Sequence, residues 1–192
     1  MLSPELIDKD ILEKISPEIS REMWSDDPEV KHAAQAKMRE AIAPISSKEF
    51  SERTVAALKC CVDYALADSR ANGKVGVLGF CFGGSYAFKI ATDDLRIKAA
   101  VPFYGHPPEP VDSVASMEAP VLAFYGEKDE RLVASLPALE LAMKDHGRDF
   151  SFMLYPQTGH AFFNDTNPRA YNEDAARDAW EKSLVFLHKH LD

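Results

Sequence analysis

This sequence lacks the features of several classes of protein. It has no apolar run long enough to span a membrane, and residues 1–6 carry neither the basic leader nor the apolar core of a secretion signal. It has only three cysteines, and an odd number that includes an adjacent pair makes a poor disulfide framework: Cys60, Cys61 and Cys81. We therefore expect a cytoplasmic chain in a reducing compartment, with no membrane partner.

An excess of basic residues is also missing. The formal net charge is −9 over 192 residues, which disfavours nucleic acid and anionic membranes as partners. No internal repeat and no cluster of metal-ligating residues at a compatible spacing occurs, so we expect no metal. The length and a hydrophobic content of 46% are typical of a single globular domain.

The first third of the chain is predicted to be helical and polar. Asp27 followed by Pro28 indicates a helix start, and Ser46 with Glu49 resembles a capping box. A helix over residues 48–68 follows, and no strand-like run occurs before residue 71. We expect one domain over residues 1–192, with a helical segment at 1–47 and a core at 48–192.

From residue 74 onward, short apolar runs alternate with amphipathic segments. Near-continuous apolar strands between helices predict an α/β fold with a mostly parallel sheet covered on both faces. The predicted strands are residues 74–78, 98–104, 120–125 and 150–155, and the predicted helices are 83–92, 136–145 and 172–190. The last helix is expected to bury one apolar face: Ala176, Trp180, Leu184, Leu187 and Leu191.

A cysteine lies between a strand and a helix in the pattern G-x-C-x-G, at residues 79–83. This is the setting of a nucleophile elbow, where Gly79 and Gly83 are expected because a Cβ would clash with nearby backbone. A thiolate is a strong nucleophile, and the helix that follows Cys81 favours the anion. The alternative is that Cys81 only packs, as buried cysteines often do.

An aspartate and a histidine follow the next strand ends in the order expected for an α/β-hydrolase. Asp129 comes after the strand at 120–125, and His160 comes after the strand at 150–155. His160 would take the thiol proton of Cys81 while Asp129 orients the imidazole ring. The backbone N–H of Phe82 would face a developing oxyanion. Taken singly, Asp129 could serve turn formation and His160 could cap a loop.

Together these motifs resemble the dienelactone hydrolase family of α/β-hydrolases. Residues 79–84 resemble its G-x-C-x-G-G elbow, and residues 103–105 resemble its aromatic-Tyr-Gly strand end. Residues 126–129 resemble its aspartate turn, and residues 159–162 its histidine loop. The resemblance implies a carboxymethylenebutenolidase-like hydrolase of esters or lactones that uses a Cys-His-Asp triad and a thioester acyl-enzyme, without metal or organic cofactor.

The chain departs from this family in two ways. Family members carry several strands before the region matched here, whereas this sequence has no strand-like run before residue 71. The sheet is therefore expected to have about four strands, and the first of them, 75–78, is expected to show an apolar edge. The chain alone is then expected to be weakly active or inactive. In addition, the stretch after the histidine, residues 162–165, lacks the family's arginine for a substrate carboxylate. An aromatic, uncharged wall there suits a neutral or apolar acyl group.

The substrate pocket is expected to include Phe80, Tyr104 and Phe162, with Trp24 a further candidate. The expected partner is a small-molecule ester or lactone, and the chain is expected to be a monomer or homodimer. Two other functions stay open: a non-catalytic shortened α/β module that associates through its open sheet edge, and a redox-active thiol protein that uses Cys81.

Overall fold

The computed structural model describes residues 6–7, 9–23 and 25–192, so the predicted role of Trp24 lies outside the described residues. The chain divides into two compact units, Met1–Cys61 and Val62–Asp192, with the division inside a helix. No helix of the described part is both long and apolar enough to cross a membrane.

The first unit is helical, as its polar sequence predicts. It contains α1 (Lys9–Lys14), α2 (Pro17–Glu22), α3 (Pro28–Ile42), the short 3-10 helix η1 (Ala43–Ser46) and the first part of α4 (Lys48–Ala67). Asp27 caps α3 and Pro28 is its first residue, which confirms the predicted helix start. The predicted capping box is wrong by one residue, because Ser47 Oγ accepts from the Phe50 N–H while Ser46 ends η1.

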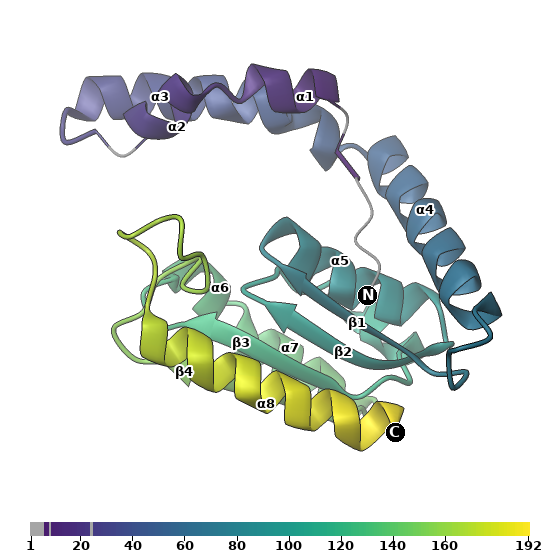
Figure 1. The fold of residues 1–192 in the computed structure, drawn as a ribbon. Coiled ribbons are helices and arrows are strands. Elements are labelled where there is room, and N and C mark those ends of the chain that lie inside the picture. The colour runs from purple at the N-terminus through teal and green to yellow at the C-terminus, as the bar shows by residue number, and fades with distance from the viewer. Residues whose placement is uncertain (1–5, 8, 24) are drawn as a thin grey trace. The chain divides into compact units, whose positions relative to one another are not determined.

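The second unit is an α/β fold built on a parallel sheet. Its four strands lie in the order β1-β2-β3-β4. Their bounds agree closely with the predicted ones: β1 (Val75–Phe80), β2 (Ile97–Phe103), β3 (Val121–Gly126) and β4 (Phe150–Tyr155). The remaining elements are α5 (Phe82–Asp93), the 3-10 helix η2 (Val111–Ser116), α6 (Glu130–Val133), α7 (Leu136–Asp145) and α8 (Glu173–Leu191). Figure 1 shows α8 on one face of the sheet and α5 and α7 on the other, which confirms the predicted layers.

The strand register brings the carboxyl ends of the strands to one edge of the sheet. Phe80 pairs with Phe103, Phe103 pairs with Phe124, and Gly126 pairs with Tyr155. The interior strands β2 and β3 are almost wholly buried, and the phenylalanines of both strands have no exposed surface. The loops that follow the strands therefore start from a rigid apolar platform.

β1 is an edge strand of the sheet formed by the described residues, since it pairs only with β2. Most of its residues are half-buried, and Phe80 keeps 36% of its surface exposed. No strand precedes β1 in the described part of the chain. The predicted apolar edge is therefore present in this structure.

The buried face of α8 agrees with the predicted one only in part, because Ala176 is buried and the side chains of Leu187 and Leu191 lie close to Gly76 of β1, while two other predicted residues stay exposed. Trp180 and Leu184 stay 40% and 39% exposed. The buried residues are small ones, Ala175, Ala176, Ala179 and Ser183. Small side chains let the helix backbone lie close to the sheet at these positions, while Trp180 and Leu184 keep much of their surface uncovered. The prediction followed hydrophobicity and overlooked this stripe of small residues.

The small buried residues of α8 give a prediction about stability. Ala179 has no exposed surface, so Ala179→Leu would overpack the helix–sheet interface and lower the free energy of unfolding by about 1–3 kcal/mol. Leu184→Ala, on the exposed side of the same helix, should cost about 1 kcal/mol or less. Chemical denaturation followed by circular dichroism measures both values. A larger loss for Leu184→Ala than for Ala179→Leu would restore the predicted face.

Candidate active site

The cysteine lies in a strained turn between β1 and α5. Cys81 has φ of 52° and ψ of −114°, a backbone conformation that side-chain-bearing residues seldom adopt. Its N–H donates to the Phe103 carbonyl at 3.0 Å, which ties the turn to the neighbouring strand. The predicted nucleophile elbow thus has the expected sharp strand–turn–helix geometry.

Two nearby glycines allow the close approach, and only one of them, Gly79, is a predicted one. A Cβ on Gly79 would lie 2.1 Å from the Gly83 carbonyl oxygen, so that position requires glycine. A Cβ on Gly83 would meet nothing within 4 Å, so the expected clash there is wrong. The second crowded position is Gly84, where a Cβ would lie 2.5 Å from the Phe103 carbonyl oxygen.

The loop that carries the aspartate and the loop that carries the histidine are joined by backbone contacts. The Lys128 N–H donates to the Thr158 carbonyl at 2.8 Å. The carboxylate of Glu127 accepts from the Gln157 N–H at 3.0 Å. A Cβ on Gly126 would lie 2.5 Å from the Thr158 carbonyl oxygen, so a larger residue would push the two loops apart.

These loops bring the side chains of Cys81, Asp129 and His160 together. His160 Nδ1 lies 2.5 Å from Asp129 Oδ2, and His160 Nε2 lies 3.2 Å from Cys81 Sγ. The Asp129 side chain makes no capping hydrogen bond to α6, although the residue precedes that helix. Its carboxylate is directed to the imidazole instead, so turn formation does not account for this side chain.

The pKa shifts in this cluster favour a thiolate beside an imidazolium. The hydrogen bond from His160 lowers the pKa of the Cys81 thiol, against the opposing effect of burial. Burial tends to lower the pKa of His160, but hydrogen bonds to Asp129 and Cys81 outweigh it and raise the pKa to about 9. Hydrogen bonding by the Phe82 backbone N–H also lowers the Cys81 pKa.

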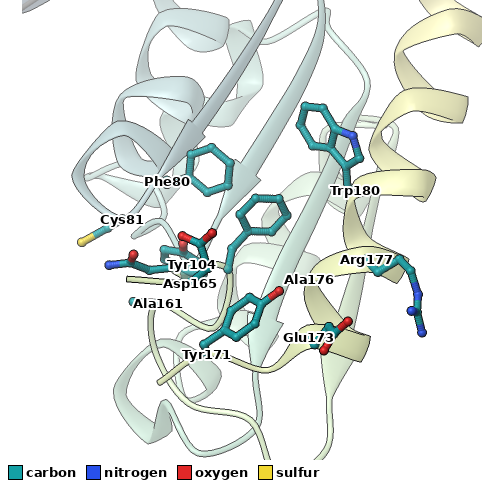
Figure 2. A pocket seen from close by; sticks show the side chains of 12 residues that line it. Phe80, Cys81, Tyr104, Ala161, Asp165, Tyr171, Glu173, Ala176, Arg177 and Trp180 are labelled. Carbon is teal, nitrogen blue, oxygen red and sulfur yellow. The ribbon is translucent and has the colours of Figure 1, made fainter. Parts of the chain in front are cut away.

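A pocket of about 740 Å³ adjoins Cys81, and the predicted pocket residues fall into two groups. Phe80 and Tyr104 line it, as Figure 2 shows. Phe162 has no exposed surface and packs its ring against Tyr104 at a centroid distance of 5.4 Å. The next residue, Phe163, lines the pocket instead.

The wall beyond the histidine loop is aromatic but carries charge. Asp165 lines the pocket together with Phe163 and Asn164, so the expected uncharged wall needs correction. Sequence reasoning also missed the contribution of α8 and the residues before it, including Tyr171, Glu173, Arg177 and Trp180. These residues lie outside every motif, and only the register of α8 against the sheet reveals them.

Asn172 is a further residue that sequence motifs did not single out for the site. Its side-chain oxygen caps α8 by accepting from the Ala175 N–H at 3.1 Å. Its side-chain amide donates to Thr158 Oγ1 at 3.0 Å, and its backbone N–H donates to the Phe162 carbonyl at 3.0 Å. One residue therefore fixes both sides of the loop that carries His160, and its position before the last helix was the only signal.

The fold is that of the α/β-hydrolases, with the elbow after β1 and the aspartate and histidine loops after β3 and β4. The model of the dienelactone hydrolase family matches residues 4–191, so the chain belongs to that family.

Individual relatives agree with this assignment. A Saccharolobus solfataricus protein named "Putative carboxymethylenebutenolidase" is 36% identical over 126 residues, which cover 66% of this chain and 48% of that protein. A Bradyrhizobium protein named "Probable 2-oxo-3-(5-oxofuran-2-ylidene)propanoate lactonase" is 35% identical over 129 residues, covering 62% and 51%. The chain spans about half the length of these curated relatives.

The fold is also found in solved structures. A dienelactone hydrolase-like promiscuous phosphotriesterase from metagenomic libraries superposes with a TM-score of 0.70 at 18% sequence identity. The match covers 82% of this chain and 69% of that one. At this level of identity the likeness concerns the fold alone.

The pKa shifts predict how Cys81 reactivity depends on pH. Because the Cys81 pKa is lowered, its thiolate should persist to lower pH than that of an ordinary thiol. His160→Ala removes the largest cause of this shift, so the rise of alkylation rate with pH should move to higher pH. The rate of iodoacetamide labelling at Cys81, measured by peptide mass from pH 5 to pH 10 in steps of about one unit, tests this expectation.

The control for the pH profile of Cys81 alkylation is His106, a histidine in the loop that follows β2. His106→Ala should shift the profile far less than His160→Ala does, since His106 is exposed and makes its hydrogen bond to Ser85 through the backbone N–H. Equal profiles for the wild type and His160→Ala would contradict the assigned cause of the shift.

The Asn172 contacts give a separate prediction about the histidine loop. Asn172→Ser keeps a good helix cap but is too short to reach Thr158. Thermal unfolding should therefore change little, while the Cys81 alkylation profile moves toward that of an ordinary thiol. Thr158→Val, which removes the acceptor, should act similarly, and Thr158→Ser, which keeps a hydroxyl, should not. An unchanged profile in Asn172→Ser would rule out this positioning role.

Proposed function

We propose that Cys81, His160 and Asp129 are the catalytic triad of an ester or lactone hydrolase that forms an acyl-enzyme on Cys81, with slow turnover expected of the chain alone. The observation that supports it best is that one imidazole ring, that of His160, contacts the Cys81 sulfur and the Asp129 carboxylate through its two nitrogens. This is the geometry needed for a nucleophile, a general base and an orienting acid. The lactonase name of one relative makes cyclic esters a substrate class to test.

The first half of the reaction forms a thioester. The Cys81 proton resides on His160, and the thiolate attacks the carbonyl carbon of the ester. The carbonyl π electrons move onto oxygen, and the Phe82 N–H donates to this oxyanion. When the tetrahedral adduct collapses, the carbon–oxygen bond to the leaving group breaks. The departing alkoxide takes the proton from the His160 imidazolium, and Asp129 stabilises the cation until then.

The second half releases the acid. Neutral His160 takes a proton from a water molecule as the water oxygen attacks the thioester carbon. The new tetrahedral adduct expels the Cys81 sulfur, and the carboxylic acid leaves. The thiolate and the imidazolium are thereby restored, so no oxidant, reductant or cofactor enters the balance. For a lactone, the alcohol formed in the first half stays attached to the acyl chain.

Acylation by a small activated ester tests this proposal. With p-nitrophenyl acetate, intact mass should show one acetyl group on Cys81, with none at this position in Cys81→Ala. His160→Ala should slow formation and hydrolysis of the adduct by about 100-fold or more, because general acid–base catalysis is lost. Cys60→Ala is the matched control and should keep the adduct, because Cys60 is an exposed cysteine of α4 outside the site.

Three other outcomes would overturn the proposal. An acetyl adduct that forms on Cys81 equally fast in the wild type and in His160→Ala would reflect ordinary thiol chemistry. No adduct at all, with association that depends on concentration, would support the non-catalytic alternative, for which the exposed edge of β1 is the relevant feature. Reversible oxidation of Cys81 without ester turnover would support the redox alternative.

A further inference from the structure

The pocket beside Cys81 presents aromatic rings on more than one side. Its aromatic residues are Phe80, Tyr104, Phe163, Tyr171 and Trp180. Figure 2 shows Phe80 and Trp180 on one side of the pocket, and Tyr171 and Glu173 on the other. These residues come from the end of β1, the loop after β2, the histidine loop and α8, so the pocket is assembled only by the tertiary fold.

Part of this lining forms a continuous apolar wall. The ring of Phe163 lies between those of Phe80 and Trp180, with centroid distances of 5.0 and 6.0 Å. Phe80 and Trp180 nevertheless keep 36% and 40% of their surface exposed. Aromatic surface that is packed on one side and uncovered on the other is well suited to contact an apolar ligand.

The charged groups at the pocket favour a ligand without negative charge. Asp165 and Glu173 place two carboxylates in the lining. The remaining charged group, Arg177, donates to Asp174 at 2.7 Å, and its guanidinium points away from Cys81 in Figure 2. A substrate carboxylate would meet two lining carboxylates and one lining guanidinium, which Arg177 shares with Asp174 on the exposed surface of α8, so the balance of charge in the lining is negative.

From this arrangement we infer that the pocket is a subsite for an uncharged aromatic group carried by the ester. The ring would lie against the wall of Phe80, Phe163 and Trp180 while the carbonyl carbon is placed at the Cys81 sulfur. This inference rests on the proposed function for the role of Cys81. It adds a ligand class, an aryl group, and a surface that binds it.

Three alkylating reagents of matched reactivity test the subsite without requiring turnover. Iodoacetamide carries no ring, N-benzyl iodoacetamide adds an uncharged ring, and N-(4-carboxybenzyl) iodoacetamide adds the same ring with a carboxylate. Peptide mass gives the rate at Cys81 and at Cys60, an exposed cysteine of the same chain outside the pocket. The ratio of the two rates removes the intrinsic reactivity of each reagent.

The benzyl reagent should raise the Cys81 to Cys60 ratio about tenfold over iodoacetamide, which corresponds to about 1.4 kcal/mol. The carboxylate should cancel most of this gain. A ratio that the benzyl group leaves unchanged would overturn the aromatic subsite. A ratio that the carboxybenzyl reagent raises as much as the benzyl one would overturn the exclusion of anions.

Two variants of α8 test whether the aromatic wall causes the preference for the benzyl reagent. Trp180→Ala removes a wall ring and should reduce the benzyl preference at Cys81 by several-fold. Leu184→Ala is the matched control, because Leu184 has a similar exposed fraction one turn further along the helix and does not line the pocket. Its preference should equal that of the wild type. Equal benzyl preferences in the wild type, Trp180→Ala and Leu184→Ala would show that the benzyl ring does not bind at this wall.

The two proposals can fail separately. If the acetyl adduct forms with His160 dependence but the benzyl group brings no gain, the ester chemistry stands and the aromatic subsite falls. If the benzyl gain appears at Cys81 while no ester acylates the sulfur, the pocket binds aromatic groups and the hydrolase proposal falls.

Discussion

The site depends on holding two loops against each other at the edge of the sheet. His160 can reach both the Cys81 sulfur and the Asp129 carboxylate only because its own loop is fixed against the turn that follows β3. Backbone hydrogen bonds and the close approach at Gly126 fix one side of that loop, and Asn172 fixes the other. A shift of about 1 Å in either loop would break the contact with sulfur, because hydrogen-bond strength falls steeply with distance.

Backbone strain is concentrated around the same place. The described residues with positive φ other than glycine are Cys81, Tyr104, Gln157 and Ala161. Each follows a strand end or flanks the histidine, and such conformations cost about 1–3 kcal/mol each. The rigid platform of β2 and β3 offsets this cost, since their phenylalanines are wholly buried and in register. The buried packing of β2 and β3 therefore stabilises the strained backbone of the residues that follow the strands.

The sequence was sufficient to predict the strands and the order of the site residues. Both signals are local, since a strand needs only a short apolar run and a motif needs only a few neighbouring residues. One prediction failed by a local shift of a single residue at a helix cap, and the other two failed because they depend on tertiary contacts. Ser47 rather than Ser46 caps α4, Ala179 and Ser183 rather than Trp180 and Leu184 are buried on α8, and Phe163 rather than Phe162 lines the pocket.

Phe162 and Phe163 illustrate why local sequence patterns do not predict which side chain lines the pocket. They are adjacent residues of the same type, yet Phe162 is wholly buried and Phe163 lines the pocket. The positive φ of Ala161 turns the chain just before them, and the Phe162 carbonyl is then held by Asn172. The choice between two equal rings is therefore made by a contact from ten residues further along the chain.

Charge balance links the reaction centre to the pocket beside it. In the proposed reaction, a thiolate at Cys81, an imidazolium at His160 and a carboxylate at Asp129 sum to one negative charge, and attack on a carbonyl would move negative charge onto the oxyanion. Asp165 and Glu173 lie along the same pocket, in a chain whose net charge is −9. A second anion on the substrate would add repulsion at the step where negative charge develops. An uncharged ring adds none and covers exposed aromatic surface, so the electrostatics and the hydrophobic effect favour the same substrate.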